Sequence, residues 1–274
     1  MKKVFQSLAE LISHNESNRS KWADSSQRTE KTKGFDQGTA TYGEAVAVAG
    51  TGWKQGANRV EKIRASLDAV VQRMAVANCS QMIYGVEGEW VDIGRIATGE
   101  PECCGSWHDQ GEGASQKIVK IVANVAVSCG VSAETIFARG AATLAAVDLL
   151  ESLGFRCELW ASKGCSGNKN SEFHTLVKEA SQPVELDRLA FCLCHPAMLR
   201  RLYFATMETF GIYPSSCSPR PVTDESDATI MLPELCTSER VTNKGMIEQI
   251  LFICKAAGVS FDESEIESII SSNE

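Results

Sequence analysis

Lys117-Ile-Val-Lys-Ile-Val-Ala-Asn-Val-Ala-Val127 is the stretch that decides the fold of this chain. Its nearly uninterrupted apolar and β-branched residues predict a strand that is covered on both faces. Ser132 can cap a helix, and an apolar stripe with helical spacing runs from Ile136 to Leu150. Gly154 is a stop signal, and Phe155-Arg-Cys-Glu-Leu-Trp160 alternates like a second strand. The order strand, helix, strand predicts two parallel strands joined by a right-handed crossover in an α/β sheet.

This arrangement indicates where a ligand or partner would bind. Open α/β sheets bind their ligands beyond the carboxyl ends of their strands. In this chain that place is the turn after the first strand, which contains Ser128, Gly130 and Ser132. We expect these residues to belong to a protein-binding surface. No catalytic motif accompanies them, so we predict a protein that binds without catalysis and without a cofactor.

The first 80 residues predict a helical N-terminal region. A short amphipathic helix is expected within residues 1–13, and Thr41 is placed to cap a second helix. A longer helix is expected from Gln55 to Ala77. Residues 14–38 are polar and have few apolar anchors, which predicts a mobile basic segment.

Residues 81–274 are expected to form the α/β core domain. Within them, Glu172–Glu179 predicts a strand, and Ala228–Leu232 predicts an edge strand because Pro233 follows it. Helices are expected over Leu186–Cys194, Pro196–Phe210 and Asn243–Ala257, the last of which Gly258 ends. The chain changes character between Gly85 and Gly113: Val86–Ile93 predicts a strand, whereas Gly99–His108 and Gly111–Gly113 predict a long acidic loop that contains glycines. Long loops inside a compact domain are usually functional or disordered. We therefore expect a protein partner to contact Glu100, Glu102 and Trp107 in this loop.

The composition excludes some classes of protein. The chain has 274 residues, of which 43% are hydrophobic and 23% are charged. No stretch approaches the roughly 20 consecutive apolar residues that cross a bilayer, so no membrane contact is expected. The N-terminus lacks the apolar core of a secretory signal, which favours a cytoplasmic location. In that compartment the eleven cysteines are expected to be reduced thiols.

The charge of the chain is unevenly distributed. The net charge is −8, but eight basic and five acidic residues give +3 between Asn18 and Lys62, and the remainder carries −11. Aromatic rings among basic residues are what single-stranded nucleic acid requires, because bases stack while phosphates are neutralised. The residues that would form such a site are Trp22, Lys31, Lys33, Trp53, Lys54 and Arg59. The alternative is that Trp53 is a core anchor and that the charges form a solvated face.

Metal and nucleophilic sites are weakly indicated. Zinc sites usually present Cys-x₂₋₄-Cys pairs, a spacing that neither of two Cys/His clusters shows. The clusters are Cys103, Cys104 and His108, and Cys192, Cys194 and His195. Cys129 would open a helix, but no histidine can be assigned as its base. The carboxylates Glu87, Glu89, Asp92, Glu100 and Glu102 lie near Lys117 and Lys120 without the spacing of a metal-dependent hydrolase.

The strand–helix–strand unit, with Leu150-Glu-Ser-Leu-Gly-Phe-Arg-Cys-Glu-Leu159, resembles the core of von Willebrand factor A-type domains. Those domains carry Asp-x-Ser-x-Ser after the first strand, and its oxygens hold a divalent cation. The matching positions here are Asn124, Ala126 and Ser128, of which only Ser128 keeps the family's residue. The resemblance implies a three-layer, Rossmann-like sheet whose metal site has lost its carboxylate ligand.

Three further stretches, Gly38-Thr-Ala-Thr-Tyr-Gly-Glu-Ala45, Gly52-Trp-Lys-Gln-Gly56 and Gly99-Glu-Pro-Glu-Cys103, resemble an uncharacterised family of phage-encoded proteins. The resemblance implies a family that includes early proteins of podoviruses. The resemblance implies a phage accessory factor in the host cytoplasm, docking on a protein through loops at the carboxyl ends of the strands. The alternatives are a single-stranded nucleic-acid-binding or transcription accessory factor and, more remotely, a metal-dependent hydrolase.

Overall fold

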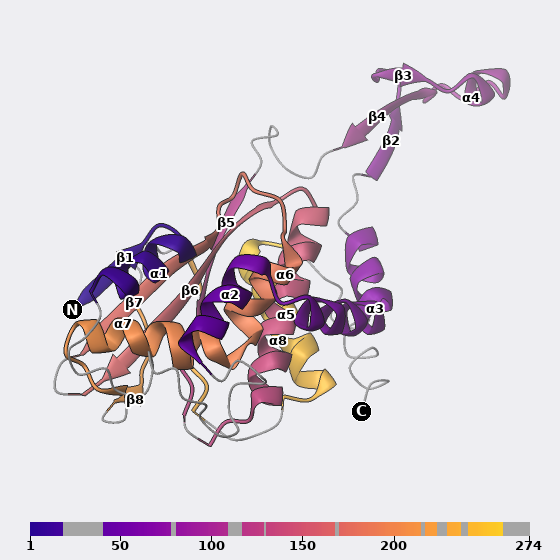
Figure 1. Cartoon of the computed structure of the whole chain (residues 1–274). Helices are drawn as coiled ribbons and strands as arrows, with labels where there is room; N and C mark the ends of the chain where they lie inside the picture. The colour runs from indigo at the N-terminus through magenta and orange to yellow at the C-terminus, as the bar shows by residue number, and fades with distance from the viewer. Residues whose placement is uncertain are drawn as a thin grey trace.

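The computed structural model combines one large sheet that carries helices with a separate three-stranded sheet (Figure 1). It describes residues 1–18, 41–77, 81–108, 117–128, 130–167, 170–214, 217–223, 229–236 and 241–259. The side chains of residues 66–77, 81–83, 107 and 108 are outside this description. None of the described helices is long and apolar enough to cross a membrane.

The predicted strand–helix–strand unit is confirmed. Strand β5 (Ile118–Asn124), helix α5 (Ala133–Ser152) and strand β6 (Arg156–Ser166) follow one another, and the two strands are parallel neighbours. The Ser132 side chain accepts a hydrogen bond from the Thr135 amide at 3.1 Å and caps α5. Strand β5 ends three residues earlier than predicted, because the Asn124 side chain accepts a hydrogen bond from the Ala126 amide at 3.1 Å and turns the chain.

The large sheet is mixed and mostly parallel, with the strand order β1-β7-β6-β5-β9. Strand β7 (Ser171–Lys178) is antiparallel to β6. Strand β9 (Thr229–Leu232) lies at the edge, as predicted, and is parallel to β5. The short β8 (Ser218–Pro219) pairs with the end of β6. The protein is therefore a mixed α/β structure built on a central sheet.

The first residues differ from their prediction. Residues 1–13 do not form one helix, because β1 (Lys2–Phe5) pairs in parallel with β7, and only then does α1 (Leu8–Ser17) begin. Ser7 caps α1 by accepting a hydrogen bond from the Glu10 amide at 3.0 Å. Phe5 is fully buried in the core. The predicted boundary at residue 80 therefore does not separate the N-terminal region from the large sheet, because β1 belongs to that sheet.

The remaining helices largely follow their predictions. Helix α2 (Tyr42–Thr51) begins with a capping box between Thr41 and Glu44, and α3 (Lys54–Ala77) follows it. Later in the chain come α6 (Leu186–Cys194), a π-helix (Met198–Tyr203), α7 (Phe204–Thr209) and α8 (Asn243–Ala257). Gly258 ends α8 in the left-handed conformation, with φ of 93°.

Helices cover one face of the large sheet in the described part of the chain. On that face Cys157 contacts the Val147 carbonyl of α5, and Tyr203 of the π-helix donates a hydrogen bond to the Ala161 carbonyl. Alternate residues of β5 point to the opposite face, where Ile118 is 63% exposed and the Lys120 ammonium lies over the Trp160 ring. In the described part of the chain the first half of β5 is therefore open on this face, which fits the charged Lys120 within the apolar run, whereas Val122 and Asn124 farther along are each 2% exposed. The predicted third layer stays a prediction.

The predicted acidic loop contains a small sheet of its own. Strands β2 (Gln81–Gly85), β4 (Cys104–His108) and β3 (Trp90–Val91) pair in that order, antiparallel, with the short helix α4 (Ile93–Ala97) after β3. We call residues 81–108 the arm, because Figure 1 shows this unit standing away from the large sheet. The prediction of a loop over Gly99–His108 is therefore wrong for the residues of β4.

Candidate functional site

The arm is held together by a few aromatic and charged side chains. The rings of Tyr84 and Trp90 meet edge to face with centroids 5.9 Å apart, and the Arg95 guanidinium lies over Tyr84 at 3.8 Å. Asp92 accepts hydrogen bonds from the Tyr84 hydroxyl and from the Gly94 and Arg95 amides. The Arg95 amide is the main cause that lowers the pKa of Asp92. These contacts fix α4 against the small sheet.

The outer surface of the arm is unusually apolar. Val86 is 74% exposed and Ile93 is 79% exposed, while Val91 and Ile96 are about half exposed. Ile93 and Ile96 are three residues apart on α4 and therefore share a side of that helix. Apolar side chains that gather on an exposed element are typical of protein-interaction surfaces.

The arm is also acidic. The arm contains five acidic residues and one basic residue, so it holds half of the chain's net charge of −8 within 28 residues. Glu102 is exposed, whereas Glu100 makes an ion pair with Arg95 at 3.0 Å. Trp107 lies on β4 opposite Met82, and its side chain is outside the described residues. The predicted residues of this loop therefore belong to one structural unit.

The other predicted binding residues lie elsewhere, at the carboxyl end of β5. The Ser128 amide donates to the Leu235 carbonyl at 2.9 Å, and the Ser128 carbonyl accepts from Val131. Ser132 caps α5, and Gly130 is exposed between them. These groups have structural roles in the turn, and the structure does not bring them together with the arm residues.

Asn124 occupies the position at which the resemblance places an aspartate. Its side chain is 2% exposed and donates to the Arg220 carbonyl at 2.8 Å and, at 3.4 Å, to Glu234. Its oxygen accepts from the Ala126 amide. The side-chain amide of Asn124 thus holds residues 217–223 across the end of the sheet.

The residues of the nucleic-acid alternative are only partly described. Trp53 is 9% exposed, and its ring packs edge-on against Phe137 and against His195, with the nearer centroid at 4.5 Å. It is therefore a core anchor and has no free face for a base. Arg59 pairs with Glu134 at 2.6 Å and lies over Phe137. Lys54 is exposed at the start of α3, while Trp22, Lys31 and Lys33 lie outside the described residues.

The cysteine clusters do not meet. Cys192 and Cys194 are buried in α6, and burial raises the pKa of the Cys192 thiol to about 12. Cys103 and Cys104 lie in the arm. Within the described residues no group of three or more His, Cys, Asp or Glu side chains could hold a metal ion. Cys129 lies outside those residues.

The predicted carboxylate–lysine cluster is also separated. Lys117 donates a hydrogen bond to the Ala257 carbonyl at 3.0 Å, and Lys120 lies over the Trp160 ring. The five carboxylates of the arm make their described contacts within the arm, where Asp92 caps α4 and Glu100 pairs with Arg95. No shared ion-binding geometry results.

A serine–histidine–glutamate arrangement on β6 and β7 was not anticipated. The Ser162 hydroxyl lies 2.8 Å from His174 Nδ1, and His174 Nε2 lies 3.5 Å from Glu172. Glu172 accepts two hydrogen bonds from Thr223, which lower its pKa although burial acts in the opposite direction. Because Ser162 is fully buried, a substrate has no route to its hydroxyl, and the arrangement acts as a buried hydrogen-bond network.

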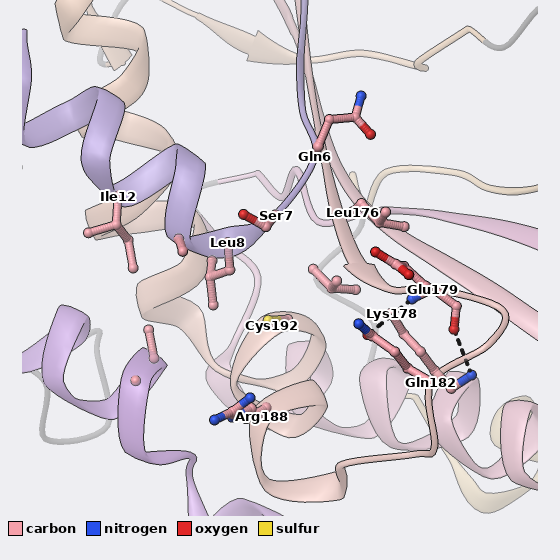
Figure 2. A pocket seen from close by; sticks show the side chains of 14 residues that line it. Gln6, Ser7, Leu8, Ile12, Leu176, Lys178, Glu179, Gln182, Arg188 and Cys192 are labelled. Carbon is pink, nitrogen blue, oxygen red and sulfur yellow. Dashed lines mark hydrogen bonds between the residues drawn. The ribbon is translucent and has the colours of Figure 1, made fainter.

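A pocket of about 360 Å³ lies at the carboxyl ends of β1 and β7 (Figure 2). Its polar lining includes Ser7, Lys178, Glu179 and Arg188. These charges already have partners: Lys178 pairs with Glu151 at 2.5 Å, and Arg188 pairs with Glu185 at 2.9 Å. The pocket thus offers a ligand few free charges, and sequence reasoning missed it because it depends on the unpredicted β1.

Comparison with known proteins gives one family. The family model of a domain of unknown function, DUF7192, matches residues 1–255. No curated protein and no solved structure matches the chain. The match covers the large sheet, its helices and the arm, and the chain therefore belongs to the DUF7192 family of domains of unknown function.

Proposed function

We propose that this protein is a non-catalytic binding protein that docks on a protein partner through its arm. The observation that supports the proposal is the exposure of Val86, Val91, Ile93 and Ile96 on one small unit. The arm's described hydrogen bonds and ion pairs are internal, so within the described residues these side chains are not used to hold it to the large sheet. A role in contacting another molecule accounts for them.

The charge of the arm defines the chemistry of the partner. An acidic rim around apolar residues complements a basic surface with an apolar centre, because complementary potentials speed association and favour the matching partner. Glu87, Glu89 and Glu102 are exposed on the arm and would form this rim. The partner is therefore a protein with a basic, partly apolar docking surface.

The sequence resemblances add a finer context to the proposal. The stretches that resemble phage-encoded proteins support an accessory factor acting in the host cytoplasm. The parallel β5–α5–β6 unit supports a von Willebrand A-like core, with Asn124 replacing the carboxylate of the metal site. Phage genes for replication or transcription beside the gene of this protein would add support.

Site-specific photo-crosslinking in cells of the native source tests the proposal. A photoreactive phenylalanine analogue replaces Ile93 on the arm, and a matched variant carries it at Tyr213, which is 46% exposed on the main body. We expect one defined protein to be joined at position 93 and not at position 213. Glu89→Gln with Glu102→Gln should lower the yield, because it removes two charges from the rim.

Two outcomes would contradict the proposal. One is equal crosslinking of the same protein at positions 93 and 213, which would indicate random encounter. The other is recovery of nucleic acid in place of protein, which would favour the alternative based on the basic N-terminal segment.

A further inference from the structure

A second cavity opens at the other end of the molecule, at the carboxyl end of β9 between α5 and α8. It has a volume of about 490 Å³, within the range of about 300–1,000 Å³ that holds small ligands. Its walls are mainly apolar. They include Leu232, Pro233, Leu235, Val241 and Phe252, while Arg139 supplies a cationic group and Glu234 an acidic one. We call this cavity the β9 groove.

Phe252 is an exposed apolar part of the groove. It projects from α8 and is 52% exposed, although the neighbouring Leu251 and Ile253 are buried. An aromatic ring in this position gives a ligand a flat apolar wall while leaving the groove open to solvent.

Arg139 supplies the polar end of the groove. Its guanidinium donates a hydrogen bond to the Pro233 carbonyl, and within the described residues no carboxylate lies at ion-pair distance from it. A guanidinium has five N–H donors, so most of them are left for another acceptor. Glu234 lines the same groove and acts electrostatically on Arg139 without an ion pair among the described residues.

Partial burial of Arg139 favours an anion beside its guanidinium. Removal from water lowers the pKa of Arg139 to about 10, even though Glu234 acts in the opposite direction. The side chain stays charged at neutral pH, and a bound carboxylate would offset part of its lost hydration.

We propose that the β9 groove binds a small apolar monocarboxylate. The carboxylate accepts hydrogen bonds from Arg139, whose planar fork matches its two oxygens. The hydrocarbon body lies against Phe252, Val241 and Leu235. This site is independent of the arm, so either proposal can fail without the other.

The contrast with the pocket of Figure 2 supports this choice. There, Lys178 and Arg188 are each paired with a carboxylate of the same chain, and Glu179 adds a further negative charge. An anion entering that pocket would have to displace an existing ion pair. Glu234 also lines the β9 groove, but within the described residues no carboxylate forms an ion pair with Arg139.

Calorimetric titration of the full chain with octanoate and with 1-octanol tests the inference. The two ligands share a hydrocarbon chain and differ in charge. We expect octanoate to bind more tightly, and Arg139→Gln to weaken it by about tenfold or more, as expected for charge-assisted hydrogen bonds. Octanol binding should not change in that variant. Phe252→Ala should weaken both ligands, because it removes the shared apolar wall.

Two control variants keep the result interpretable. Arg188→Gln, in the pocket of Figure 2, should bind octanoate as the wild type does. Arg139→Lys keeps the charge without the fork and should give an intermediate affinity. The inference is overturned if octanoate and octanol bind equally, if neither binds in the millimolar range, or if Arg188→Gln matches the loss in Arg139→Gln.

Discussion

Single buried polar groups connect the helices of this protein to its sheet. Tyr203 is fully buried, and its hydroxyl donates to the Ala161 carbonyl at 2.6 Å and lies 3.0 Å from the Thr175 hydroxyl. Burial raises the pKa of Tyr203 well above its usual range, so the hydroxyl stays protonated and remains a donor. One side chain thus joins the π-helix to two neighbouring strands.

Tyr203→Phe should destabilise the protein by about 1–3 kcal/mol, because it leaves buried acceptors without their donor. Urea unfolding followed by circular dichroism measures the loss. Tyr213→Phe is the matched control, since Tyr213 is 46% exposed, and it should change the free energy of unfolding by less than about 0.5 kcal/mol. Equal effects in the two variants would refute this role of Tyr203.

At the scale of single residues, several contacts could not be predicted from the sequence. Trp53 could be a stacking face or a core anchor, and the choice depended on Phe137 and His195, which are distant in sequence. The pairing of Ser162 with His174 had no sequence signal, because only the register of two strands brings them together. Arg139 carries no local sequence signal of a site, because the groove beside it forms only where α8 and the end of β9 meet α5.

At the scale of elements, the close contact of α5 with α6 depends on Gly140. A Cβ atom at this position would lie 2.5 Å from the Leu193 carbonyl oxygen and 2.6 Å from Cys194 Sγ. Such distances are much shorter than van der Waals contact, so the two helices would have to move apart. Gly140 therefore sets how closely the helices approach, although it is unfavourable for helix formation.

Gly140→Ala should destabilise the protein by about 1–3 kcal/mol, since overpacking exceeds the gain in helix propensity. Gly43→Ala is the control, because Gly43 lies in α2 with nothing within 4 Å of its added Cβ. That variant should stabilise by about 0.5–1 kcal/mol. Thermal and urea unfolding would contradict the account if both substitutions changed stability in the same direction.

The elements that sequence predicted well are those with strong local patterns. The apolar run of β5, the stripe of α5 and the glycine after α8 each carry their own signal. Strand β1 does not, because Val4, Phe5, Leu8 and Leu11 also fit a helix, and only pairing with β7 makes residues 2–5 a strand. Likewise, β4 becomes a strand only through pairing with β2 across the arm.

At the scale of the whole molecule, the two proposed binding surfaces are separated. The arm holds exposed apolar and acidic groups, and the β9 groove lies at the edge of the large sheet. The sequence correctly identified the arm as a region distinct from its surroundings, because acidic and glycine-rich composition is visible locally. The sequence did not indicate that apolar side chains of the arm are exposed, because their exposure depends on which residues the small sheet covers.

The most direct test of the central claim is the affinity of the arm's crosslinked partner, measured by calorimetry at low and high salt. We predict weaker binding as salt rises, a flatter salt dependence in Glu89→Gln/Glu102→Gln, and a loss of about tenfold or more in Ile93→Ser at both salt concentrations. Tyr213→Ser should bind as the wild type does. Unchanged affinity in both arm variants would contradict docking through the arm.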